Sequence, residues 1–328
     1  MGNASLKKIA VLTSGGDAPG MNAAIRAVVR TANYHKIECV GVRGGYTGLI
    51  EGNFTKMGPR SVSNIINLGG TILRSARSKE FRTEEGRQKA FEQCQKNGID
   101  ALVCIGGDGT FTGAKIFAEE FGVKVIGVPG TIDNDIYGTD FTIGYDTALN
   151  TAMEAIDKIR DTATSHNRVF FIEVMGRDAS FIALNSGIAS GALDILIPEK
   201  KDSLEDLFET FEKAQKRGKT SSIVIVAEGE RLASTYELAE QTKQRFPDYD
   251  IRVSILGHIQ RGGAPSCADR VLASRMGYGA VVGLMKGLTN VMAGIRSNDL
   301  VFTPIEDAIK KHNEINQDLL QIAEILAM

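Results

Sequence analysis

Short apolar runs of strand length recur along this chain, and each ends in glycine or in a polar loop. Amphipathic helical patterns separate them, for example at 203–217, where Ser203 precedes Asp206 as in a capping box and Gly218 ends the pattern. Strands that alternate with helices predict an α/β protein with largely parallel, doubly wound sheets. The predicted strands are Ile9–Leu12, Cys39–Val42, Ala101–Ile105, Val123–Val128, Val169–Val174, Ile223–Ala227 and Val253–Leu256.

The length of the chain, 328 residues, favours two domains over one. We therefore expect two doubly wound Rossmann-like domains. No low-complexity linker marks a boundary, so the boundaries are inferred from the helix and strand patterns, near Gly144 and near Gln260. The predicted larger domain is 1–144 plus 260–311, and the predicted smaller domain is 145–259 plus 312–328.

Composition excludes several classes of protein. A net charge of −2 does not mark the surface as a general binder of nucleic acid or of anionic membranes. No apolar run reaches the roughly 18 to 20 residues of a membrane span. The four cysteines are widely separated and form neither a CxxC pair nor a zinc set, which predicts a reduced, cytoplasmic protein.

In doubly wound sheets, ligands bind beyond the carboxyl ends of the strands, so functional residues are expected in the loops that follow them. The first predicted strand leads into Thr13–Gly20, with the sequence TSGGDAPG, and then into a predicted helix from Met21 to about Tyr34. Glycines let backbone N–H groups approach an anion, and a helix N-terminus adds favourable charge. The loop favours a phosphate site, although it lacks the Walker A lysine. The alternative is a tight turn without a ligand.

The second loop, Gly106–Thr110, has the sequence GGDGT and leads into a helix predicted to open at Phe111. Its three glycines admit phosphates, and the Asp108 carboxylate is of the type that holds Mg²⁺ in phosphoryl transfer. The alternative role for Asp108 is that of a helix N-cap.

The third loop, Pro129–Asp135, places two carboxylates two residues apart after a buried strand. In an extended loop, Asp133 and Asp135 would point in opposite directions. One could then accept a hydroxyl proton while the other orients Mg²⁺ or neighbouring groups. Either carboxylate is therefore a candidate base. The alternative is a turn rich in Asp and Asn.

Basic residues follow other strands. Arg177 comes after the predicted strand Val169–Val174, and Arg261 lies in GHIQRGG with His258. Guanidinium groups suit a substrate phosphate, although a lone arginine is more often a surface charge. Glu228 could accept hydrogen bonds from sugar hydroxyls. Arg26 and Arg30 are spaced to lie above one another on a helix, on a solvated face or around an anion.

Five segments, in this order and at this spacing, resemble bacterial ATP-dependent 6-phosphofructokinases over essentially the whole chain. The resemblance implies transfer of the γ-phosphoryl of ATP to the 1-hydroxyl of fructose 6-phosphate in glycolysis, with Mg²⁺ required. The segments are LTSGGDAPGMN (12–22), IGGDG (105–109), PGTIDND (129–135), EVMGR (173–177) and LGHIQRGG (256–263).

The resemblance also implies roles for individual residues. Catalysis would fall to Asp133 as base with Thr131, Arg77 and Arg177. The larger domain would bind ATP through Gly16, Arg77, Ser78, Gly107, Asp108, Gly109 and Thr110, with Asp108 serving Mg²⁺. The smaller domain would supply much of the sugar-phosphate site, which comprises Thr131, Ile132, Asp133, Asp135, Arg168, Met175, Gly176, Arg177, Glu228, Arg252, His258 and Arg261.

By the same resemblance, Arg168 and Arg252 would serve the site of a neighbouring subunit, which implies a homotetramer. An allosteric effector site is expected at Arg26, Arg30, Arg160, Arg217 and Lys219. Leu193 stands where well-studied members carry an acidic residue, and the arginine expected at Pro59 is shifted by one position. These departures leave the identity of the effector open.

Gly109 and Gly130 occupy the positions that distinguish the ATP-dependent branch from a pyrophosphate-dependent branch, and bulkier residues there would obstruct the nucleotide. A pyrophosphate-dependent enzyme is one alternative. A catalytically silent sugar-phosphate sensor is another. Lipid and NAD kinases share the GGDGT string but lack the TIDND and HIQRGG segments.

Overall fold

The computed structural model describes residues 6–200 and 203–327, which divide into two compact units. The first runs to Thr147 and resumes over Arg261–Asn313; the second comprises Ala148–Gln260 and the chain from Glu314 on. Both units are layered α/β structures with largely parallel sheets, as the sequence predicts. Among the described residues, no helix combines the length and apolar character needed to cross a bilayer.

The first unit is built on a seven-stranded sheet in the order β11-β10-β5-β4-β1-β2-β3. Only the two edge strands, β3 and β11, run antiparallel to their neighbours. The strands are β1 (Lys8–Thr13), β2 (Glu38–Val42), β3 (Phe54–Met57), β4 (Ala101–Gly106), β5 (Lys124–Pro129), β10 (Val291–Arg296) and β11 (Asp299–Pro304).

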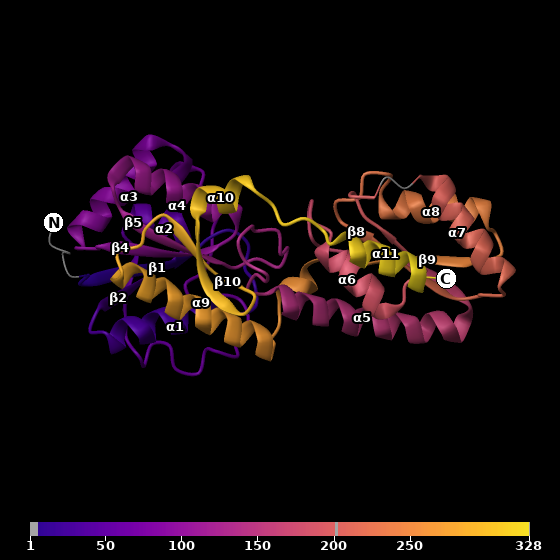
Figure 1. Cartoon of the computed structure of the whole chain (residues 1–328), viewed down its shortest axis with the longest axis horizontal. Helices are drawn as coiled ribbons and strands as arrows, with labels where there is room; N and C mark the ends of the chain where they lie inside the picture. Colours follow the sequence, from indigo (N-terminus) through magenta and orange to yellow (C-terminus); the bar gives the residue numbers. More distant parts are fainter. Residues whose placement is uncertain (1–5, 201–202, 328) are drawn as a thin grey trace. The chain divides into compact units, whose positions relative to one another are not determined.

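Helices cover both faces of this sheet. Figure 1 shows α3, α4 and α10 on one face, with α1 and α9 on the other. The helices are α1 (Met21–Tyr34), α2 (Gly45–Glu51), α3 (Glu84–Lys96), α4 (Asp108–Phe121), α9 (Cys267–Met285) and α10 (Ile305–Lys310), with the 3₁₀ turn η1 (Glu80–Arg82) before α3. The central strands β1, β4 and β5 are almost wholly buried, which explains their continuous apolar sequences.

The second unit has a four-stranded parallel sheet in the order β7-β8-β6-β9. Its strands are β6 (Arg168–Val174), β7 (Asp194–Leu196), β8 (Ser222–Ala227) and β9 (Asp250–Ile255). Helices α7 (Leu204–Lys216) and α8 (Thr235–Arg245) cover one face, and α6 (Phe181–Ser190) and α11 (Gln317–Leu326) cover the other (Figure 1). The remaining elements are α5 (Tyr145–His166) and the 3₁₀ segment η2 (Gly257–Arg261).

Most of the predicted elements are present, and some boundaries differ. The capping box predicted at Ser203 forms with Asp206, and α1 has the predicted bounds. However, α4 begins at Asp108, three residues before the predicted start at Phe111, and Gly107 occupies the N-cap position. The alternative in which Asp108 caps the helix is therefore wrong. Strands β3, β7, β10 and β11 were not predicted.

Candidate functional site

The three loops singled out in the first unit follow β1, β4 and β5, which are neighbours in the sheet and run in the same direction. Their carboxyl ends therefore meet at one edge, where ligands of doubly wound sheets bind. Backbone hydrogen bonds fasten the three loops together. Ser14 N donates to Ile105 O at 3.0 Å, and Gly130 N donates to Gly106 O at 3.0 Å.

The first loop contains Gly16, which is exposed and borders Arg261. Arg261 Nη1 donates to Asp17 O at 3.3 Å, and a Cβ added at Gly16 would lie 2.7 Å from the same nitrogen. A side chain at position 16 would displace the arginine. Arg261, predicted to bind the sugar phosphate, thus contacts the first phosphate-type loop of its own unit.

The second loop opens α4, and the Thr110 side chain ties it to the first loop. Thr110 Oγ1 donates to Ser14 O at 3.0 Å, and Tyr46 Oη donates to Thr110 O at 2.5 Å. A Cβ added at Gly109 would meet no atom within 4 Å, so this position faces open space at the N-terminus of a 14-residue helix. Exposed N–H groups of a helix N-terminus favour a phosphate there.

Gly130 differs from Gly109 in what surrounds it. A Cβ added at Gly130 would lie 3.2 Å from side-chain atoms of both Ile105 and Met21. A larger residue would therefore press on buried packing. Of the two positions used to infer the phosphoryl donor, only Gly109 opens into empty space.

The third loop carries Asp133, of which 4% is exposed. Thr131 Oγ1 accepts a hydrogen bond from Asp133 N and donates to Asp133 Oδ2, both at 3.2 Å. The predicted extended loop is wrong at Asn134, whose φ of 56° bends the chain between the two carboxylates. Ile132, also predicted to contact the sugar phosphate, is fully buried.

Three carboxylates interact at this edge of the sheet. Burial, together with the negative charges of Asp108 and Asp133, raises the pKa of Asp135 to about 6. His312 opposes this pKa shift weakly. The edge thus combines glycine loops that suit phosphate with a group of carboxylates that suits a cation and a proton acceptor.

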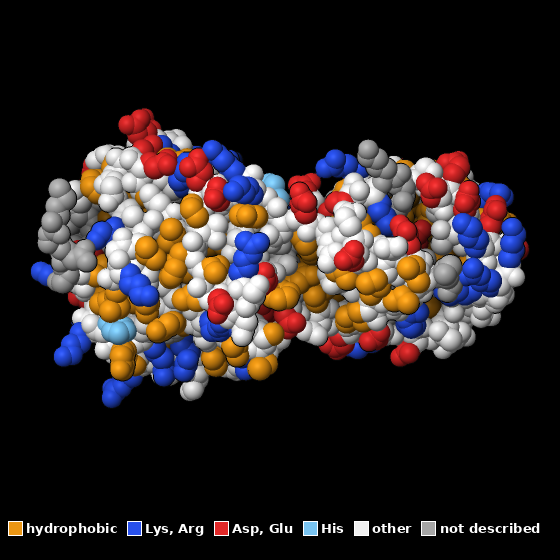
Figure 2. All heavy atoms as spheres, viewed as in Figure 1, with side chains coloured by type: hydrophobic (Ala, Val, Ile, Leu, Met, Phe, Trp, Pro, Cys, Tyr) orange, Lys and Arg blue, Asp and Glu red, His pale blue; other side chains and the backbone are white. Residues whose placement is uncertain are grey.

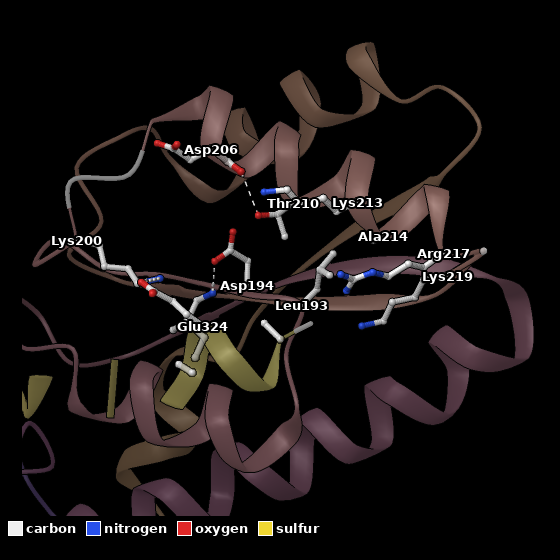
Figure 3. A pocket seen from close by; sticks show the side chains of 14 residues that line it. Leu193, Asp194, Lys200, Asp206, Thr210, Lys213, Ala214, Arg217, Lys219 and Glu324 are labelled. Atoms are coloured by element: carbon white, nitrogen blue, oxygen red, sulfur yellow. Dashed lines mark hydrogen bonds and ion pairs between the residues drawn. The ribbon is translucent and has the colours of Figure 1, made fainter. Parts of the chain in front are cut away.

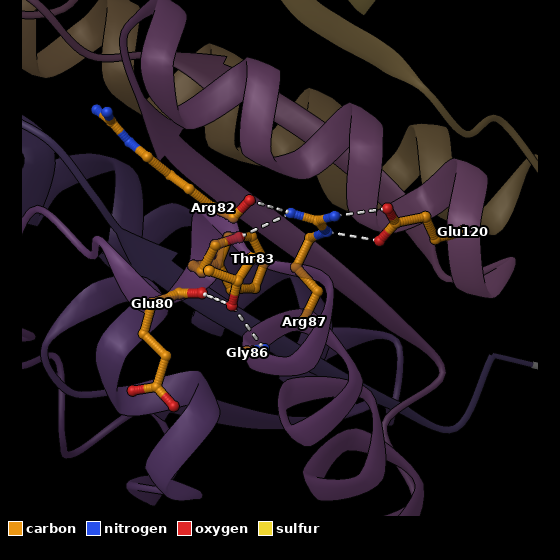
Figure 4. A network of polar contacts seen from close by, with 7 residues as sticks. Glu80, Arg82, Thr83, Gly86, Arg87 and Glu120 are labelled. Carbon is orange, nitrogen blue, oxygen red and sulfur yellow. Dashed lines mark hydrogen bonds and ion pairs between the residues drawn. The ribbon is translucent and has the colours of Figure 1, made fainter.

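Arg77 and Ser78 lie in the segment that leads into η1 and α3, and a polar network anchors this segment to α4 (Figure 4). Arg87, which is 8% exposed, donates from Nη1 to Phe81 O at 3.1 Å and to Arg82 O at 2.8 Å. Its Nε and Nη2 donate to Glu120 at 2.5 and 2.6 Å, which lowers the pKa of that carboxyl.

Aromatic packing also helps to anchor the segment that contains Arg77 and Ser78. The Phe81 ring stacks on Tyr46 at 4.0 Å, and Tyr46 donates to the backbone of the second loop. Ser78 Oγ accepts from Phe81 N at 3.2 Å, while the Arg77 side chain is exposed. The sequence reading missed Tyr46 and Arg87, because Thr110 is 64 positions from Tyr46 and Glu120 is 33 positions from Arg87.

In the second unit, the predicted sugar-phosphate residues follow the adjacent strands β6, β8 and β9. Arg177 has a φ of 52°, and its N donates to Glu228 Oε2 at 3.2 Å. Buried Gln260 accepts from Met175 N at 3.3 Å, while the Arg177, Glu228 and His258 side chains are exposed. The structure brings these strand-end residues to one edge of the smaller sheet.

Arg168 and Arg252 do not lie at that edge. Arg168 is the first residue of β6, a strand of seven residues, so its backbone is about 20 Å from the strand end that precedes Arg177. Asp250 pairs with both arginines, at 2.7 Å from Arg168 Nε and 3.0 Å from Arg252 Nη2. Within one chain, these arginines are thus separated from the other sugar-phosphate residues of the second unit.

The second unit also contains a pocket of about 820 Å³ beside α7, β7 and α11. Figure 3 shows Arg217, Lys219 and Leu193 at this pocket, together with the carboxylates Asp194 and Glu324. Burial lowers the pKa of Lys219, and the charges of Arg160 and Arg217 lower it further. Three of the predicted effector residues therefore form one cluster of positive charge.

Arg26 and Arg30, the other predicted effector residues, lie on α1 of the first unit. Burial lowers the pKa of Arg26, and the adjacent Arg30 adds to this shift. Acidic and basic side chains are mixed over the face shown in Figure 2. The basic pair on α1 and the basic cluster in the second unit are thus local concentrations of positive charge on a protein whose surface carries both signs of charge.

Comparison with known proteins identifies the family. The phosphofructokinase family model matches residues 8–284. The ATP-dependent 6-phosphofructokinase of Cytophaga hutchinsonii is 57% identical over 321 residues, covering 98% of both chains. The ATP-dependent 6-phosphofructokinase 1 of Thermus thermophilus is 54% identical and covers 98% of this chain and 100% of the relative.

Solved structures agree with this match. Phosphofructokinase from Saccharomyces cerevisiae superposes with a TM-score of 0.88 at 38% identity, over 93% of this chain and 45% of the yeast chain. This chain therefore spans less than half of the yeast chain. A pyrophosphate-dependent phosphofructokinase from Nitrosospira multiformis shares the fold, with a TM-score of 0.87 at 19% identity. The chain belongs to the phosphofructokinase family.

Proposed function

We propose that this protein is an ATP-dependent 6-phosphofructokinase that converts fructose 6-phosphate and ATP into fructose 1,6-bisphosphate and ADP in glycolysis. The observation that carries the proposal is the edge formed after β1, β4 and β5, where two glycine loops lie beside Asp108, Asp133 and Asp135. The close relatives named as ATP-dependent 6-phosphofructokinases support the same reaction.

In the proposed mechanism, Asp133 accepts the proton of the sugar 1-hydroxyl as its oxygen bonds to the γ-phosphorus of ATP. The bond between that phosphorus and the β–γ bridging oxygen breaks, and ADP leaves. Thr131 orients the Asp133 carboxylate through its hydrogen bond. We assign ATP to the first unit, with Arg77 stabilising the transferring phosphoryl, and most of the sugar-phosphate contacts to Arg177 and its neighbours.

The residues present fit a Mg²⁺ ion held jointly with phosphates. No three His, Cys, Asp or Glu side chains within 6–200 and 203–327 are grouped to hold a metal by themselves. Kinase Mg²⁺ is usually held by one or two carboxylates together with substrate phosphates, and Asp108 supplies a carboxylate at a helix N-terminus suited to phosphate. When bound, Mg²⁺ neutralises charge on the phosphates.

The function is tested with purified protein, fructose 6-phosphate and Mg²⁺, supplied in parallel with ATP, pyrophosphate or no donor. We expect formation of fructose 1,6-bisphosphate with ATP only. Turnover with pyrophosphate but not ATP would establish the alternative branch. No turnover with either donor, alongside binding of fructose 6-phosphate, would indicate a silent sensor.

The open space at Gly109 gives a test of donor choice. Gly109→Asp is expected to raise the KM for ATP by about tenfold or more, because its carboxylate would extend toward the polyphosphate and repel it. Gly109→Ala is the matched control, since a methyl group enters the same space without charge, and its KM should change little. Equal effects of the two substitutions would show that charge at this position does not govern ATP binding.

We further propose a homotetramer with shared active sites. The separation of Arg168 and Arg252 from Arg177 within one chain supports this arrangement, since these two arginines would then serve a neighbouring subunit's sugar phosphate. Light scattering coupled to size-exclusion chromatography measures the oligomeric state.

The proposal that neighbouring subunits share active sites is tested by subunit complementation. Asp133→Asn and Arg252→Ala enzymes, each weakly active at low fructose 6-phosphate, are co-expressed to form hybrids. If Arg252 acts across an interface, about a quarter of the sites in randomly mixed hybrids are intact, and activity recovers accordingly. Activity that equals the average of the two parents would place both residues in the same subunit's site.

The cluster of Arg160, Arg217 and Lys219 supports an anion site for an allosteric effector, which we propose together with Arg26 and Arg30. Adding ADP or phosphoenolpyruvate to the same assay tests regulation. We also propose a cytoplasmic location. It is supported by the four free cysteines, of which Cys39, Cys94 and Cys104 are buried, as in a protein of a reducing compartment.

A further inference from the structure

The segment from Thr131 to Thr142 carries the proposed base, yet contains a single isolated bridge residue, Ile136, and no helix or strand of its own. Hydrogen bonds between residues of this segment fix the conformation of its backbone at Asn134. Asn134 Oδ1 accepts from Thr142 N at 2.8 Å, and Thr142 Oγ1 donates to Thr131 O at 2.7 Å. These bonds explain how Asn134 is kept in its left-handed conformation.

Asn313 contacts the same segment from a part of the chain far away in sequence. It follows α10, next to His312, which forms an isolated bridge with Ile136. Asn313 N donates to Asp135 O at 3.3 Å. Its side-chain Nδ2 donates to the carbonyls of Ile136 at 2.9 Å, Thr139 at 3.2 Å and Asn134 at 3.4 Å.

A primary amide matches this set of acceptors. Its nitrogen carries two hydrogens, so the two shorter bonds use one each and the longest is a shared contact. An aspartate of the same shape would present only acceptors to the three carbonyls, and alanine would present nothing. Asn313 therefore holds together two stretches of backbone, 134–136 and 139, on the carboxyl side of Asp133.

We propose that Asn313 is a positioning residue for phosphoryl transfer, which fixes the backbone of Asn134–Thr139 and thereby the directions of the Asp133 and Asp135 carboxylates. The inference rests on the proposed function. Reacting groups must be held closely, since a displacement of about 1 Å far from the chemistry can cost on the order of 10²-fold in rate. Asn313 itself contacts backbone and is assigned no contact with substrate.

The test compares Asn313→Asp and Asn313→Ala with the wild type by steady-state kinetics. We expect both variants to lower kcat by about 10- to 100-fold while the KM values for ATP and fructose 6-phosphate change less than about threefold. This split follows because the ligand contacts remain and only the alignment of the base is lost. Asn313→Asp separates loss of the donor from loss of volume.

Asn97→Ala is the matched control, because Asn97 Nδ2 donates to a carbonyl, Gln93 O at 2.8 Å, at the end of α3. Its kcat should stay at the wild-type level even if its melting temperature falls. A normal kcat in folded Asn313→Asp and Asn313→Ala enzymes, or a rise in KM with unchanged kcat, would overturn the proposal.

Hydrogen exchange provides a second readout. Amide exchange of 131–142 should accelerate in the Asn313 variants and remain at the wild-type rate in the central strands β1 and β4. Unchanged exchange in that segment would also overturn the proposal. This measurement needs no activity, so a wild-type protein that fails to turn over substrate would reject the proposed function while the contact of Asn313 is still tested.

Discussion

Replacing Asp133 by asparagine is expected to lower kcat by about 10²- to 10⁴-fold, the usual scale for loss of a general base. Asparagine keeps the shape of the side chain and its place beside Thr131, but cannot take the proton of the attacking hydroxyl. Because the ligand contacts persist, the KM values should change much less than kcat. Initial rates over a matrix of both substrate concentrations measure the split.

Two variants complete this test. Asp157→Asn changes an exposed carboxyl on α5 and should leave kcat unchanged. Asp135→Asn examines the neighbouring carboxyl, whose pKa of about 6 makes it a competing candidate for the base. A loss of kcat confined to Asp135→Asn, with Asp133→Asn fully active, would transfer the role to Asp135.

Asp269→Asn is expected to destabilise the first unit by about 3 kcal/mol, because the substitution removes an acceptor oxygen that buried backbone donors require. Asp269 is 1% exposed; Oδ1 accepts from Gly144 N at 2.8 Å, and Oδ2 accepts from Thr147 N at 2.8 Å and Thr147 Oγ1 at 2.5 Å. Asparagine has one acceptor oxygen, so its NH₂ group would face at least one of these N–H groups.

The bonds to Asp269 hold the start of α5. Burial raises the pKa of the Asp269 carboxyl, and these hydrogen bonds offset part of that rise. For a unit of this size, the expected loss corresponds to roughly 6–12 °C in melting temperature. Differential scanning calorimetry of Asp269→Asn measures it. Asp299→Asn, at an exposed carboxyl at the start of β11, is the control and should melt within about 1 °C of the wild type. A similarly small shift in Asp269→Asn would show that these bonds contribute little net stability.

Much of the fold follows from local sequence. The buried strands β1, β4 and β5 are nearly continuous apolar runs that end at Thr13, Gly106 and Pro129, so their type was predicted correctly. The unpredicted strands lie at the edges of the sheets or pair with edge strands, as β3 and β11 do. Edge strands are half-exposed and carry weaker patterns, and pairing with a formed neighbour decides their conformation.

The proposed site likewise combines features that follow from local sequence with features that only the folded chain decides. The sequence by itself determined the three loops and their glycines and carboxylates, because parallel strands bring successive loops to one edge whatever the rest of the chain does. The bend at Asn134 was decided by hydrogen bonds to Thr142 and Asp140, and a local reading predicted an extended loop instead.

Only the tertiary structure decided which residues support the backbone segments in and around the proposed site. Arg87, Asp269 and Asn313 have no motif of their own, and each acts on a segment through its backbone. Asn313 meets the carbonyl of Ile136 from 177 positions along the chain. Every residue offers the same backbone N–H and C=O, so the sequence does not mark which of them a distant side chain will bind; that depends on how the folded chain brings them together.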